Sequence, residues 1–175
     1  MRDNARHQEQ IIEWYDKYSM ALFKYILKMI QDTQQAEDLT QDTFIKAYTY
    51  VKKGNEITYP KTFLYRIAHN LTVDHIRKNK PIQMIKDFFT TREDPGPSVE
   101  AMVEIKESSK ELYHALSLLK VNYRQVIILR KVEEFSVRET AEILNWSETK
   151  VKTTLSRGLQ ALANEIHKGG ATNEI

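Results

Sequence analysis

Apolar side chains recur along this chain at spacings of three and four residues, the periodicity of an amphipathic helix. The first such stripe predicts a helix of roughly 23 residues and consists of Ile11, Tyr15, Tyr18, Leu22, Ile26 and Met29. A second helix is predicted to begin at Asp32, whose N-cap partner would be Gln35, and to end at Gly54. A third is predicted from Pro60 to about Asn79.

The pattern changes at Pro81. Periodicity weakens from there to residue 105, and Asp94-Pro95-Gly96-Pro97 cannot lie inside a helix. We interpret residues 81–105 as a flexible linker, with a short helical piece between Ile82 and Phe89.

Helical periodicity returns after the linker. Four more helices are predicted, over about 105–119, 122–132, 136–144 and 147–167, followed by a disordered tail over 169–175. Ser136 and Glu139 have the spacing of a capping box. The sequence therefore predicts an all-α protein with two small helical domains, residues 1–80 and 106–168.

Composition narrows the function classes. The chain has 175 residues, no cysteine and a formal net charge of +2, which excludes disulfides, thiolate catalysis and cysteine-based zinc sites. No apolar run approaches the roughly 18 residues of a membrane span, and the first twenty residues carry several acids, unlike a secretory signal. We expect a cytoplasmic protein without direct membrane insertion.

Charge is distributed in blocks. Residues 32–48 hold four acids and one base, whereas residues 61–80 hold five bases and one acid. Residues 87–111 hold seven acids and three bases, and residues 120–132 hold four bases and no acid. Such segregation indicates separate surfaces for partners of opposite charge, although any one block could be a solvated helix face.

Catalysis has little support in the sequence. The five histidines show no metal-ligand spacing, and no phosphate-binding loop or nucleophile motif occurs. A metal-dependent hydrolase built around Glu37, Asp38 and Asp42 is an alternative, but it lacks histidine partners. We expect a binding protein rather than an enzyme, with no cofactor and no metal.

Residues 135–162 carry the clearest motif: a helix of about nine residues, a turn at Asn145-Trp146 and a longer helix, as in a helix-turn-helix. The two helices would be locked together by Ala141, Ile143, Leu144, Trp146, Val151 and Leu155. Short hydroxyls and long cations would then face outward, where they suit phosphates and base edges in a major groove. An ordinary helical hairpin is the alternative reading.

Three stretches, in order, resemble the extracytoplasmic-function (ECF) sigma factors, the smallest class of bacterial RNA polymerase initiation subunits. Ala36 to Tyr48 resembles region 2.2, and Thr62 to Asn70, with Asp74 and Arg77, resembles regions 2.3 to 2.4. Tyr123 to Arg130, together with Ser136 to Arg157, resembles region 4. The resemblance covers nearly all the chain outside the linker and tail.

The resemblance implies a task for each charged surface. Region 2.2 would dock on the β′ clamp helices of core RNA polymerase through Asp38, Gln41, Asp42, Phe44 and Tyr48. The third helix and the loop before it would read the minus-ten promoter element through Tyr59, Lys61, Phe63, Arg66, His69, Asn70 and Arg77, and Tyr65 could also stack on bases. A stripe opposite the apolar face would be formed by Arg66, His69, Asn70, Val73 and Arg77.

Region 4 would contact the β flap of the polymerase and read the minus-thirty-five element through Thr149, Lys150, Lys152, Thr153, Ser156 and Arg157. Three positions depart from the family pattern. Phe63 stands where Trp is usual, and a Pro is usual near Lys120. Thr154 stands where an Arg is common, which removes roughly one phosphate contact. None of these departures undoes the assignment.

The sequence therefore predicts a sigma factor that binds core RNA polymerase and directs promoter-specific initiation. The resemblance also implies control by an anti-sigma factor, often membrane-anchored. The rival is a free helix-turn-helix regulator with an N-terminal dimerisation or sensor domain. That alternative function does not explain the acidic and basic helices of the first half.

Overall fold

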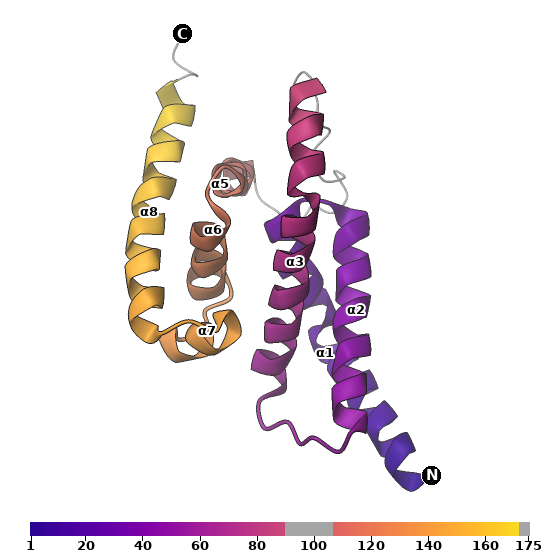
Figure 1. Cartoon of the computed structure of the whole chain (residues 1–175). Helices are drawn as coiled ribbons and strands as arrows, with labels where there is room; N and C mark the ends of the chain where they lie inside the picture. The colour runs from indigo at the N-terminus through magenta and orange to yellow at the C-terminus, as the bar shows by residue number, and fades with distance from the viewer. Residues whose placement is uncertain (90–106, 172–175) are drawn as a thin grey trace. The chain divides into compact units, whose positions relative to one another are not determined.

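The computed structural model describes residues 1–89 and 107–171, and every element in these ranges is helical. The chain divides into two compact units, Met1–Val99 and Glu100–Ile175, each with its own core (Figure 1). An all-α, two-domain architecture was the expectation from the sequence, and it is confirmed.

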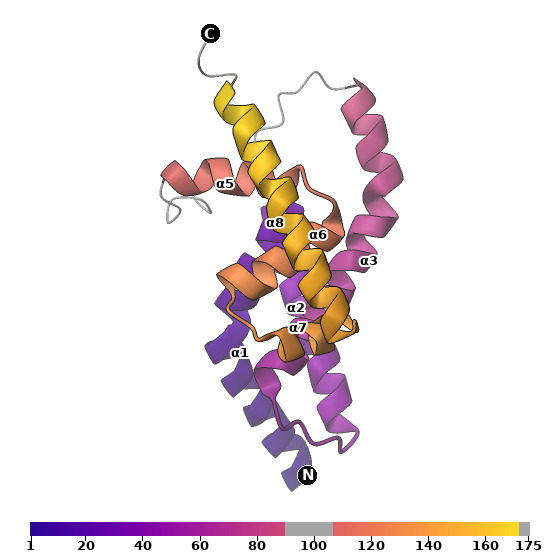
Figure 2. The same ribbon diagram turned by 90° about the vertical axis from the view of Figure 1, so that its left-hand side faces the viewer.

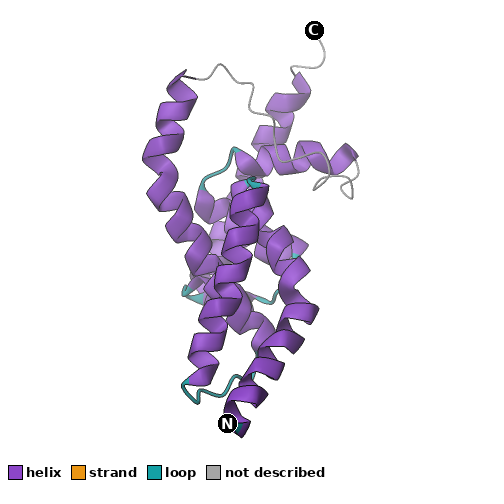
Figure 3. Cartoon of the chain, turned by 90° about the vertical axis from the view of Figure 1, so that its right-hand side faces the viewer, coloured by secondary structure: helices purple, strands orange, loops and turns teal. Residues whose placement is uncertain are grey.

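Three helices form the first unit: α1 (Arg2–Ile30), α2 (Thr33–Lys52) and α3 (Pro60–Phe89). The predicted N-cap of α2 is present, because the Asp32 carboxylate accepts a hydrogen bond from the Gln35 backbone N–H at 3.0 Å. After α2 the chain turns at Gly54, whose φ of +88° is readily adopted by glycine. The three helices pack on one another in pairs (Figure 3).

The core of the first unit is rich in aromatic rings. Tyr25 and Tyr65 are fully buried, and their ring centroids lie 5.3 Å apart. Trp14 is buried and packs edge-on against Phe63 at 6.3 Å. Such pairs add to the stability that apolar burial supplies.

Helix α3 is longer than the sequence indicated. We predicted that it would end near Asn79, and that prediction is wrong, because the helix continues through Pro81 to Phe89. Proline deletes one backbone hydrogen bond, but its fixed φ is that of a helix, so the residues after it can resume the helical pattern. The helix thus crosses the boundary placed at residue 80, and the rest of the predicted linker, residues 90–105, lies outside the described residues.

The second unit contains α5 (Glu107–Ser117), α6 (Val121–Ile127), α7 (Val137–Leu144) and α8 (Glu148–Ala171). Helix α8 packs along α6 and against α5 and α7 (Figure 2). We predicted a disordered tail from residue 169, but α8 remains helical through Ala171. The final four residues lie outside the described part of the chain.

The end of α6 also differs from expectation. The sequence predicted one α-helix over 122–132, whereas a π-helical turn, Ile128–Val132, follows α6. In it the Glu133 N–H donates to the Ile128 carbonyl, five residues back, at 2.9 Å. Residues 125–129 are all buried. Five consecutive buried residues are more than one face of an ordinary helix can hold, and the wider π-helical turn begins within this run.

Candidate functional site

Helix α2 presents an acidic face to solvent. Asp38, Gln41 and Asp42 are all exposed, as predicted. The Gln34 side chain donates a hydrogen bond to the Asp38 carboxylate at 3.3 Å. Because Asp38 and Asp42 are four residues apart, they share one side of the helix.

The two aromatic residues predicted for the same surface lie elsewhere. Phe44 is only 5% exposed and packs against Tyr15 of α1, with ring centroids 5.0 Å apart. Tyr48 is half-buried, and its hydroxyl donates to the Asn4 side-chain oxygen at 2.9 Å. Phe44 therefore belongs to the core, where its packing against α1 holds α2 in place and so positions the acidic face.

Helix α3 carries an exposed polar stripe. Arg66, Asn70 and Arg77 follow one another at steps of four and seven residues and are all exposed. Arg77 forms an ion pair with Asp74 on the same helix. Lys61 is exposed at the start of α3, and Tyr59, just before it, has 73% of its surface exposed.

His69 was predicted to lie on this stripe, and that placement is wrong. Its side chain is 6% exposed, and burial lowers the pKa of the imidazole from 6.5 to about 4. Tyr65, also proposed for base stacking, is fully buried. Helical spacing puts both residues between the apolar and polar faces, so the pattern alone did not decide their direction.

Phe63 lies between the core and the surface. It is half-buried, with Trp14 on one side and the ring of Tyr50 at 5.1 Å. Tyr50 is 44% exposed and extends this aromatic group toward solvent at the end of α2. The sequence analysis missed Tyr50, although its place near the predicted loop was a usable signal.

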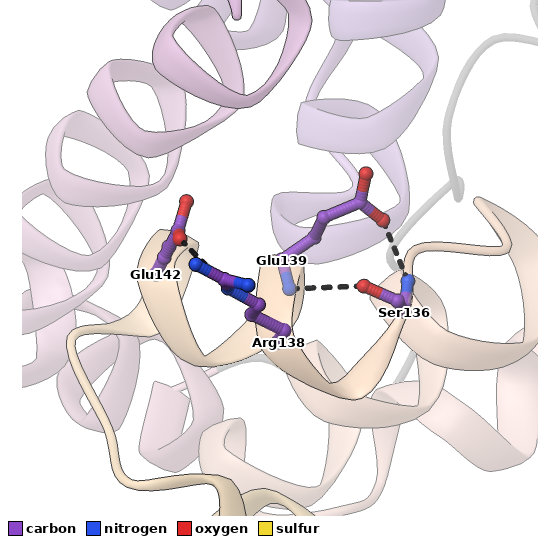
Figure 4. Close-up of polar contacts among 4 residues, drawn as sticks. All are labelled: Ser136, Arg138, Glu139 and Glu142. Carbon is purple, nitrogen blue, oxygen red and sulfur yellow. Dashed lines mark hydrogen bonds and ion pairs between the residues drawn. The ribbon is translucent and has the colours of Figure 1, made fainter.

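The second unit contains a helix-turn-helix formed by α7 and α8. A capping box opens α7: the Ser136 hydroxyl accepts from the Glu139 N–H at 3.1 Å, and the Glu139 carboxylate accepts from the Ser136 N–H at 2.7 Å (Figure 4). Asn145, with φ +56°, ends α7 in the left-handed conformation. The Ser147 hydroxyl then accepts from the Lys150 N–H at 3.1 Å and caps α8.

Burial within the motif follows the prediction closely. Ala141, Ile143, Leu144 and Val151 are buried, and Trp146 and Leu155 are half-buried. All six predicted contact residues are exposed on α8: Thr149, Lys150, Lys152, Thr153, Ser156 and Arg157. The face that would enter a groove is thus polar, cationic and free of large apolar groups.

Two arginines of the basic block at 120–132 have a structural task. Arg124 donates to the backbone carbonyls of Leu116, Ser117 and Leu119 at 3.0–3.1 Å. Arg130 donates to the carbonyl of Phe135. Counting charges along the sequence could not separate these arginines from those that face a partner.

The described residues were also compared with the requirements of a metal site and of a membrane span. Across 1–89 and 107–171, no three histidine, aspartate or glutamate side chains gather as a metal site would require, Glu37, Asp38 and Asp42 included. No helix in these ranges has the length and apolar character needed to cross a membrane. What the structure offers is a three-helix unit with an acidic and a basic face, followed by a helix-turn-helix unit.

This arrangement defines a class of protein: a two-unit helical protein with an exposed acidic helix face in the first unit and a helix-turn-helix in the second. Two families match it in order, Sigma-70 region 2 over residues 14–82 and Sigma-70 region 4 over residues 109–162. Two curated relatives come from Bacillus subtilis. The ECF RNA polymerase sigma factor SigX is 34% identical over 87% of this chain and 81% of its own length. The ECF RNA polymerase sigma factor SigW is 31% identical over 91% of this chain and 90% of its own length.

The chain belongs to the ECF RNA polymerase sigma factors, proteins that direct promoter-specific transcription initiation. Solved structures agree at the level of the fold. The sigma factor RpoE of Bartonella quintana, in complex with the anti-sigma factor NepR, matches 91% of this chain and 98% of its own with a TM-score of 0.71 at 22% identity. CnrH, in complex with the cytosolic domain of CnrY, matches 95% of this chain and 94% of its own, with a TM-score of 0.68 at 19% identity.

Proposed function

We propose that the acidic face of α2 docks this sigma factor on the β′ clamp helices of core RNA polymerase, and that the second unit contacts the β flap. The supporting observation is that Asp38, Gln41 and Asp42 are exposed together within the region 2 half of the chain. An acidic helix face suits a basic coiled-coil partner, and close charge pairs at such interfaces each contribute about 1.5 kcal/mol or more.

The docking proposal is tested with the double variant Asp38→Arg, Asp42→Arg. It should lose core polymerase binding, while its helical content stays near wild type because both side chains are exposed. Glu13→Arg with Asp16→Arg is the matched control, since it makes the same change of charge at two exposed sites on α1. Equal affinity of wild type and the α2 variant for core polymerase would refute the docking face.

For the promoter we propose a division between the two units. Arg66, Asn70 and Arg77, with Tyr59 and Lys61, would hold the minus-ten strand. The six exposed side chains on α8 would read the minus-thirty-five element in the major groove. The protein would act in the cytoplasm, as a specificity subunit and not as an enzyme.

We further propose control by an anti-sigma factor. The two related folds were solved in complexes with NepR and with the cytosolic domain of CnrY. Exposed docking faces on two small units give such an inhibitor surfaces to cover. Purification of the chain from its native host at low expression should yield a second small protein in a one-to-one complex with it. This protein should compete with core polymerase for binding to the chain. Recovery of polymerase subunits alone, with full activity in unstressed cells, would favour control by expression.

A further inference from the structure

The turn of the helix-turn-helix contains an aromatic–cation pair. The Nζ of Lys150 lies 4.3 Å from the centroid of the Trp146 ring, well inside the roughly 6 Å over which a cation is attracted to an aromatic face. Trp146 is the second residue of the turn, and Lys150 stands in the first turn of α8. The contact therefore joins the turn to the start of the recognition helix.

Helix stability does not explain a lysine at this position. A cation in the first turn opposes the helix dipole, which favours acids there. No carboxylate within 1–89 or 107–171 forms an ion pair with Lys150, whose side chain is exposed. A long exposed lysine normally samples many rotamers, and the indole face restricts this one.

The position of Lys150 relates to a departure noted in the sequence. Thr154 stands where a cation is common in the family, and Lys150 precedes it by four residues, one helical turn. Positions four apart lie on the same side of a helix. A cation at residue 150 can therefore serve the same strip of α8 from one turn nearer its start.

We propose that Trp146 is a positioning residue for promoter recognition: its ring holds the Lys150 ammonium in place for a phosphate of the minus-thirty-five element. This inference rests on the proposed DNA contact of α8. Lys150 would then supply the phosphate contact that Thr154 cannot make, with less loss of side-chain entropy on binding. Trp146 itself need not touch the DNA.

A double-mutant cycle in the reconstituted holoenzyme tests the coupling. Binding to a promoter fragment with an intact minus-thirty-five element is measured across a range of salt concentrations for wild type, Trp146→Leu, Lys150→Met and the double variant. Lys150→Met should lower affinity several-fold and reduce the salt slope by about 1. Trp146→Leu should lower affinity roughly 2–5-fold and should have no further effect once Lys150 is Met.

Two further measurements separate positioning from folding. Trp146→Phe keeps an aromatic face and should retain most of the wild-type affinity, whereas Trp146→Leu should not, at equal thermal stability by circular dichroism. In the free protein, the ring current should move the Lys150 Hε resonances upfield, and this shift should vanish in Trp146→Leu.

The outcomes separate the positioning role of Trp146 from the proposed promoter contact of α8. Equal losses from Trp146→Leu with and without Lys150, or no loss at all, would overturn the positioning role. Failure of the wild-type holoenzyme to bind the promoter fragment would instead overturn the proposed promoter contact. Retained wild-type binding with an additive cycle would leave the sigma function in place and remove only the Trp146–Lys150 coupling.

Discussion

Arg124 should be essential for the stability of the second unit rather than for DNA binding. Its Nε donates to the Leu116 carbonyl at 3.1 Å, and its Nη2 donates to those of Ser117 and Leu119 at 3.0 Å each. These carbonyls belong to the end of α5 and the turn after it, where the ordinary helical hydrogen bonds run out; the Leu116 carbonyl also accepts from the Leu119 N–H at 3.1 Å. The guanidinium therefore acts as a C-terminal cap held on the neighbouring helix α6.

The size of the effect follows from these contacts. A hydrogen bond to a charged group contributes about 1.5–3 kcal/mol. The three do not simply add, because water can reach part of the carbonyls and removing a buried guanidinium recovers its desolvation cost, the same cost that lowers the pKa of Arg124. We expect Arg124→Met to lower the free energy of unfolding by about 2–4 kcal/mol, a large part of the roughly 4–10 kcal/mol of a unit this size.

Urea unfolding measures this loss. The chain has two tryptophans, and with Trp14→Phe as background the fluorescence of Trp146 reports the second unit alone. With an m-value of about 1 kcal/mol/M, the midpoint should fall by roughly 2–4 M. Arg138→Met is the control, since Arg138 is 83% exposed and its pair with Glu142 at 3.8 Å is worth about 0.5 kcal/mol or less. An Arg124→Met midpoint no lower than that of the control would refute the reasoning.

Three further predictions concern packing, protonation and promoter reading. Gly158→Ala should gain less stability than Gly170→Ala, because its Cβ would lie 3.2 Å from Cβ of Tyr123, whereas a Cβ at Gly170 meets nothing within 4 Å and the variant keeps the helix-propensity gain of alanine. Thermal melts that rank Gly158→Ala as the more stable variant would count against this packing. The first unit should lose stability as pH falls from 6.5 toward about 4, by up to roughly 1.4 kcal/mol per pH unit, because the unfolded state binds a proton that buried His69 does not. Urea titrations across this range should show a shallower decline for His69→Gln, and parallel declines would exclude the linkage. Asn70→Ala should impair promoter opening and minus-ten discrimination by about 1–3 kcal/mol, so permanganate footprints that match wild type on every minus-ten variant would remove Asn70 from the reading face.

The helical fold and most of the α8 surface were predictable from the sequence, because both depend on local patterns. Periodicity placed the helices, and the Ser136–Glu139 capping box fixed the start of α7. On α8 every residue predicted to face outward does so, since its apolar and polar positions separate cleanly.

The errors arise where tertiary packing overrides the local pattern. His69 sits at the border of the polar face of α3 and is buried there, and Phe44, placed on the docking surface, packs instead against Tyr15 of α1. Helix α3 passes through Pro81, which a local rule treats as a stop. Arg124 looked like part of a basic surface but caps another helix through carbonyls that no sequence pattern marks.

The most direct test of the account is run-off transcription with purified core RNA polymerase on fragmented genomic DNA, followed by sequencing of the transcript 5′ ends. Adding the chain should produce new transcripts whose start sites share one pair of upstream elements near minus ten and minus thirty-five. The Asp38→Arg, Asp42→Arg variant should produce none of them. If the chain alone binds specific DNA tightly while core polymerase gains no new start sites, it is a free regulator and the account is wrong.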